Sequence, residues 1–145
     1  YYYLFTLLMA LKDKLTGIGG GSKLNFLFGQ PYGLFSYLTT FGMICPSKAD
    51  SFYSLVKKGD YTNARKFVTD LEHPVCEIYL PIGEPLVYKV LFHLVGLPVK
   101  LIVRPPCAGQ KVSEAQIKAL KNILIQQNKS GSKVCDICSG NMKMI

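Results

Sequence analysis

Lys12 is the first candidate for a reactive side chain in this sequence, because it follows directly after an apolar run. Positions 4–11 are largely apolar, and the run stops at the charged cluster Lys12-Asp13-Lys14. An amine attacks a ketone only when it is unprotonated, so desolvation or a neighbouring positive charge must lower its pKa. A lysine at the end of a buried strand meets that requirement. If the strand ends before it, Lys12 is simply the first solvated residue, and Lys14 is the rival amine if the strand continues past Asp13.

Two further segments contain residue types that bind ligands elsewhere. The glycine-rich segment 17–23 (GIGGGSK) could be a phosphate-binding loop, but it lacks the Gly-Lys-Ser/Thr order of a nucleotide site, and a flexible join is the favoured interpretation. Cys135 and Cys138 form a single Cys-x-x-Cys pair. A zinc site needs two more ligands, and the two histidines, His73 and His93, lie in segments that favour helices, so we expect no metal site.

Composition limits the class of protein without specifying a function. The chain has 145 residues, enough for one domain, and 49% of them are hydrophobic, so disorder is not expected. The formal net charge of +8 comes from dispersed lysines, which favours a solvated surface over a nucleic-acid interface. Five cysteines, an odd number, fit a reducing compartment, the cytoplasm or the mitochondrial matrix. The apolar run near residue 4 is too short for a membrane span of roughly 20 residues.

The pattern of apolar residues predicts three short strands followed by four helices. The strands are expected at 4–12, 24–28 and 41–45, each a short apolar run next to a charge, glycine or proline, with a short helix at 33–40. Capping residues and three- to four-residue apolar steps then predict helices after Ser47, Asp60, Pro85 and Ser113, with Pro74 kinking or dividing the second. The polar segment 128–145 is expected to be loose.

Several segments resemble motifs of one enzyme family, in the same order along the chain. They are 57–66 (KKGDYTNARK), 83–89 (GEPLVYK), 94–97 (LVGL), 103–106 (VRPP) and the pair Ser113-Glu114. In the first third, 10–13 (ALKD), Phe28-Gly29 and 42–45 (GMIC) resemble the ends of the sixth, seventh and eighth strands of a barrel. With these motifs, roughly residues 7–127 resemble the dihydrodipicolinate synthase and N-acetylneuraminate lyase family.

The resemblance implies an α/β fold, namely the C-terminal portion of a (β/α)8 TIM barrel followed by a C-terminal helical extension. Residues 1–46 would be the partial barrel, 47–127 the helical region and 128–145 the tail. It also implies a lyase or aldolase whose Lys12 forms a Schiff base with pyruvate or another 2-keto acid, without a cofactor. Ile44, by its backbone carbonyl, and Gly29 would line the substrate pocket, and the protein would be a homo-oligomer.

The sequence also departs from that family. The family's catalytic tyrosine, its carboxylate-binding threonine pair and its first five strands precede the lysine strand, whereas only eleven residues precede Lys12. The segment 15–23 is shorter than the ~10–12 residues that a crossover with its helix needs. We therefore expect a chain that is incomplete as an enzyme. The alternative is a non-catalytic barrel remnant or truncated paralogue that acts as an association module.

Overall fold

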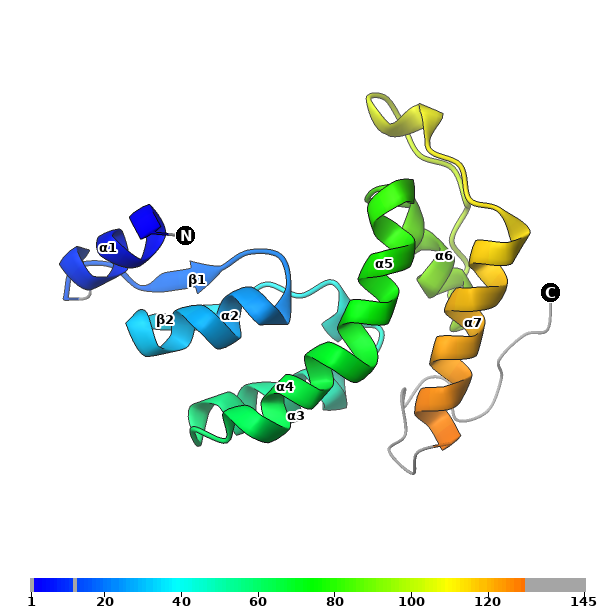
Figure 1. Cartoon of the computed structure of the whole chain (residues 1–145). Coiled ribbons are helices and arrows are strands. Elements are labelled where there is room, and N and C mark those ends of the chain that lie inside the picture. Colours follow the sequence, from blue (N-terminus) through cyan, green and yellow to red (C-terminus); the bar gives the residue numbers. More distant parts are fainter. Residues whose placement is uncertain (1, 12, 130–145) are drawn as a thin grey trace.

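The structure is a computed structural model in which residues 2–11 and 13–129 are described. It is a mixed α/β fold, mostly helical, with a small sheet of two parallel strands. In Figure 1 the sheet lies beside α1 (Tyr2–Leu11) and α2 (Lys23–Gly29), while α6 (Leu86–Leu94) and α7 (Glu114–Lys129) lie on the other side of α5 (His73–Ile82). The α/β class predicted from the sequence is confirmed. The barrel portion stays a prediction.

The sheet is built by one β–α–β unit. β1 (Gly17–Gly19) and β2 (Leu34–Tyr37) pair in parallel, with Gly19 opposite Tyr37. The connection consists of α2 and a 3-10 turn, η1 (Gln30–Tyr32), and ends at Gly33, whose φ of 104° is one that glycine adopts readily. The chain therefore contains the repeating unit of a parallel α/β sheet.

The strand positions predicted from apolar runs are wrong. Positions 4–12 were expected to be a strand, but 2–11 form α1, while 24–28 lie within α2 and 41–45 contain the 3-10 turn η2 (Phe41–Met43). The predicted helix at 33–40 contains β2 instead. Short apolar runs have no periodicity that separates a strand from a short buried helix, so flanking glycines were an insufficient guide.

The glycine-rich segment expected to be a flexible join supplies β1. A side chain at Gly17 would place its Cβ 2.5 Å from Leu8 Cδ2, and one at Gly19 would lie 3.3 Å from Leu34 Cδ1. Because glycine has no side chain, α1 and β2 can approach the backbone of β1 closely at these positions. Composition alone does not distinguish this role from flexibility.

The helical predictions for the second half are confirmed. α3 (Pro46–Lys57) begins with proline in its first turn, and α4 (Tyr61–Phe67) is capped by Asp60, whose carboxylate accepts a hydrogen bond from Asn63 N at 3.1 Å. The Ser113–Gln116 capping box closes at the start of α7. Pro74 lies in the first turn of α5, directly after a π-helical segment, η3 (Val68–Glu72), so α4, η3 and α5 follow one another without a break.

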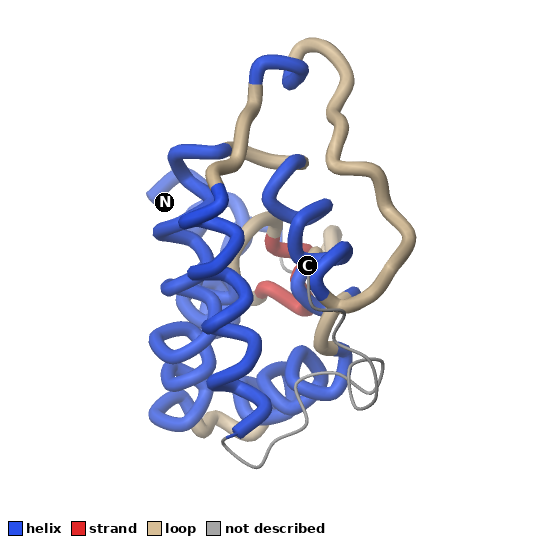
Figure 2. Tube along the Cα trace, turned by 90° about the vertical axis from the view of Figure 1, so that its right-hand side faces the viewer, coloured by secondary structure: helices blue, strands red, loops and turns tan. Residues whose placement is uncertain are grey.

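Two large apolar clusters form most of the core, and a small third one gathers around Ile82, Leu86 and Val103. One joins α2, β2, α3 and α4 through residues that include Phe26, Leu34 and Phe52. The other joins η2, η3, α5, α6 and α7. A 3-10 turn, η4 (Cys107–Gly109), stands at the tip of the loop that projects from the helices in Figure 2. The sheet half and the helical half therefore have separate cores, which meet along η3 and the loop after β2.

Replacing Gly29 by alanine is expected to destabilise the protein. The added Cβ would lie 2.1 Å from Leu34 Cδ1, so α2 and β2 would have to move apart, at a cost of about 1–3 kcal/mol. Gly20→Ala is the matched control, because nothing lies within 4 Å of its Cβ position. Urea denaturation followed by circular dichroism measures both variants, and equal midpoints would contradict the packing described for Gly29.

Candidate functional site

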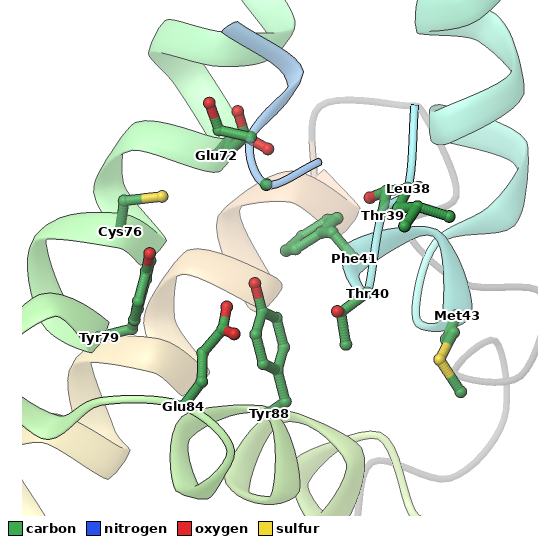
Figure 3. Close-up of a pocket in the computed structure, with 12 residues that line it drawn as sticks. Leu38, Thr39, Thr40, Phe41, Met43, Glu72, Cys76, Tyr79, Glu84 and Tyr88 are labelled. Carbon is green, nitrogen blue, oxygen red and sulfur yellow. The ribbon is translucent and has the colours of Figure 1, made fainter. Parts of the chain in front are cut away.

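A cavity of about 320 Å³ lies at the carboxyl ends of both strands. The segment after β1 contributes Gly21 and Ser22, and the segment after β2 contributes Leu38, Thr39 and Thr40. Figure 3 shows Glu72, Cys76 and Tyr79 along one wall and Glu84 and Tyr88 along another, with Phe41 and Thr40 opposite them. Ligands of parallel α/β sheets bind at this end of the strands, because the loops that follow the strands converge there.

The cavity wall is rich in hydroxyl groups and carboxylates. Hydroxyls come from Ser22, Thr39, Thr40, Tyr79 and Tyr88, and carboxylates come from Glu72 and Glu84. None of the described lining residues is a lysine or an arginine, although the whole chain has a formal charge of +8. The wall therefore offers hydrogen bonds and negative charge.

The carboxylates affect the ionisation of their neighbours. Burial, followed by the neighbouring Glu72 carboxylate, raises the pKa of the Cys76 thiol to about 11. Burial also raises the pKa of Tyr88, whose hydroxyl donates a hydrogen bond to Glu84. Cys76, Tyr79 and Tyr88 therefore stay protonated and can donate hydrogen bonds at neutral pH.

Lys23 lies directly behind this wall. It is 1% exposed, and its Nζ lies 3.5 Å from Glu72 Oε1, so the pair is chiefly ionic. The backbone N–H of Lys23 donates to both Glu72 oxygens at 2.9 Å. Nζ also lies 5.0 Å from the centre of the Phe41 ring, which lines the cavity. Burial lowers the pKa of Lys23 more than Glu72 raises it.

Of the three site residues predicted from the sequence, Gly29 and Ile44 are described, and Lys12 lies outside the described residues. Lys14 is exposed in the turn after α1. Gly29 ends α2 and packs against Leu34, and Ile44 is 0% exposed within the core. Neither Gly29 nor Ile44 is among the residues that line the cavity.

Lys23 and Glu72 were not singled out from the sequence. Lys23 was the last residue of the glycine-rich segment, and Glu72 was one charged residue in a helical pattern. The residues are 49 positions apart, so no local spacing relates them. The available signal was weak: Ser22-Lys23 directly precedes an apolar run, an arrangement that also fits a helix start.

No grouping of histidine, cysteine, aspartate or glutamate in the described part of the chain could hold a metal ion. Cys45 is buried, and Cys76 and Cys107 are free thiols. The Cys135–Cys138 pair and most of the predicted loose tail lie outside the described residues, whereas α7 extends to Lys129. In the described chain, no helix combines the length and the apolar character needed to cross a bilayer.

Neither a protein-family model nor a curated protein matches this sequence. The likeness to the dihydrodipicolinate synthase and N-acetylneuraminate lyase family therefore stays a prediction, which is supported by the motifs alone.

Glu72→Gln is expected to destabilise the protein strongly. The substitution leaves the buried Lys23 without its carboxylate, and breaking a buried ion pair costs about 3–5 kcal/mol. Glu77→Gln is the control, because Glu77 pairs with His73 at the surface, where an ion pair contributes about 0–1 kcal/mol. Chemical denaturation of both variants at neutral pH checks the difference, and a Glu72→Gln protein as stable as the Glu77→Gln protein would contradict the role given to this pair.

Proposed function

We propose that this chain belongs to a Schiff-base-forming lyase or aldolase that acts on a small carbonyl substrate of the 2-keto acid type. The observation that supports the proposal best is the position of the cavity. It lies at the carboxyl ends of a parallel strand pair, where (β/α)8 barrel enzymes carry their active sites. The order of motifs in the second half of the chain supports the same class.

In this proposal a lysine amine condenses with the keto group. The resulting iminium withdraws electrons from the adjacent carbon, so the neighbouring C–C bond can break or form. The resemblance assigns the amine to Lys12. The strand that was expected to bury Lys12 is the helix α1, none of whose described residues is buried, so the assignment now rests on the resemblance alone.

The assignment predicts a covalent adduct at Lys12. When the protein is incubated with pyruvate and reduced with borohydride, we expect one added group per chain in the intact mass, located at Lys12 by peptide mapping. Lys12→Arg should abolish the adduct, and Lys14→Arg, which alters the neighbouring rival, should retain it. An adduct at another lysine would remove the Lys12 assignment, and the absence of any pyruvate adduct would remove the 2-keto acid as the substrate class.

A second candidate function, homo-oligomeric association, is favoured by exposed apolar side chains on the sheet half. Ile18 in β1 is 59% exposed, Phe35 in β2 is 57% exposed and Leu7 in α1 is 55% exposed. In the described chain the two strands pair only with each other, so each has an open outer edge. Apolar side chains next to open strand edges are typical of surfaces that a partner chain covers.

Ile18→Glu is expected to weaken such self-association, because a carboxylate at the interface would have to be desolvated. Sedimentation velocity at micromolar protein concentration should show an oligomer for the unmodified chain and a shift to monomer for the variant. Leu80→Glu is the control, since Leu80 is 70% exposed on α5, away from the sheet. A chain that is monomeric at all concentrations would exclude this second function.

A further inference from the structure

The lining of the cavity limits the carbonyl compounds that can enter it. A 2-keto acid brings a carboxylate, and the described wall has no lysine or arginine to receive it but has Glu72 and Glu84 to repel it. The same wall presents five side-chain hydroxyls, from Ser22, Thr39, Thr40, Tyr79 and Tyr88. An uncharged, polyhydroxylated molecule would bind through its own hydroxyl groups, and the hydroxyls and carboxylates of this wall can form hydrogen bonds with them. The volume, about 320 Å³, is at the low end of the roughly 300–1,000 Å³ of small-molecule sites.

Lys23 is an amine in contact with the wall of this cavity. Its Nζ is surrounded by residues of the cavity wall, with Glu72 Oε1 at 3.5 Å and the Phe41 ring centre at 5.0 Å. The Phe52 ring lies behind it, 6.0 Å away. An ammonium in such surroundings has lost its water, and burial lowers the pKa of Lys23 as a result. Desolvation is the physical condition under which a lysine becomes a nucleophile.

We propose that Lys23, rather than Lys12, is the amine of this cavity, and that it captures a small, uncharged hydroxy-carbonyl compound. This inference rests on the proposed Schiff-base function and changes both the residue and the class of substrate. Capture requires Lys23 to turn its Nζ past the Phe41 ring into the cavity. The four-carbon stem of lysine has the rotatable bonds for such a movement.

The condensation balances with the groups that are present. The Lys23 ammonium gives one proton to Glu72, and the neutral amine adds to the carbonyl carbon, forming a C–N bond while the carbonyl electron pair moves to oxygen. That oxygen takes up the proton held by Glu72 and a second proton from the nitrogen, and the carbinolamine loses water as the nitrogen lone pair forms C=N. The sum is ammonium plus carbonyl giving iminium plus water, with no oxidant or reductant consumed. Glu72 is then the counter-ion of the iminium.

The experiment compares two probes on the whole chain. The protein is incubated with dihydroxyacetone or with pyruvate, at the same low millimolar concentration and neutral pH, and is then reduced with borohydride and digested. Mass spectrometry measures the fraction modified at each lysine. With dihydroxyacetone we expect severalfold more adduct at Lys23 than at the exposed Lys14, since a lowered pKa raises the free-base fraction of an amine. With pyruvate we expect little adduct at Lys23.

Burial makes this result diagnostic, because a lysine that is 1% exposed and has only a structural role would react last. Lys48 is the matched internal control: it is 8% exposed, burial lowers its pKa as well, and it does not line the cavity. Lys23→Met, checked for folding by circular dichroism, should lose the dihydroxyacetone adduct while Lys48→Arg keeps it. Should Lys23→Met not fold, the peptide map of the unmodified chain decides by itself.

The outcomes separate this inference from the function on which it rests. Preferential dihydroxyacetone labelling of Lys23 supports the inference. A pyruvate adduct at Lys12 with none at Lys23 overturns it and leaves carbonyl capture standing. Labelling of Lys23 no higher than that of Lys48 with both probes also overturns it. If no lysine is modified above the level of the denatured chain, carbonyl capture itself fails, and the inference fails with it.

Discussion

The buried contact between Glu72 and Lys23 holds α2 against η3, where the sheet half and the helical half of this molecule meet. The carboxylate accepts two hydrogen bonds from the first backbone N–H of α2 and lies 3.5 Å from the Lys23 ammonium. Glu72 is the last residue of η3, and Lys23 is the first of α2, so the contact lies at a boundary that the continuous helix α4–η3–α5 also crosses. Apolar contacts within each half are extensive, but a polar group at the boundary sets the relative position of the halves, because its geometry is directional.

The position of the cavity follows from that contact. Its walls come from the loops after β1 and β2 on one side and from η3, α5 and the start of α6 on the other. The loops belong to the sheet half and the helices to the other half, so the cavity forms only when the two halves keep this relative position. Removing two charges from water is costly, and a buried ion pair of this kind contributes more to geometry than to net stability. Proteins tolerate this cost of desolvation where side chains must keep a defined arrangement, as they must around a binding site.

The sequence predicted the helices after residue 46 well and the elements before it poorly, for physical reasons that can be named. Asp60 and the Ser113–Gln116 pair act on their own helix ends, so their effect can be read locally, whereas the cap expected at Ser47 lies inside α3, which begins at Pro46. The apolar runs near Leu24 and Phe41 carry no period, and only tertiary packing decides whether they become helix or strand. The strand in the glycine-rich segment was missed because its glycines are required by Leu8 and Leu34, which approach from other elements. The Lys23–Glu72 pair could not be foreseen, since it depends on how the two halves meet.

The π-helical segment Val68–Glu72 also sets the direction in which α5 presents its side chains. Such a segment holds one residue more than an α-helical stretch of the same rise, and one residue turns the helix by about 100°. Because α4, η3 and α5 are continuous, loss of a single codon there would rotate every later side chain of α5 relative to α4. Cys76 and Tyr79 would then face a different direction. Val75 would also turn out of the core that it shares with α6 and α7, so this one extra residue fixes both the packing of α5 and its part of the cavity wall.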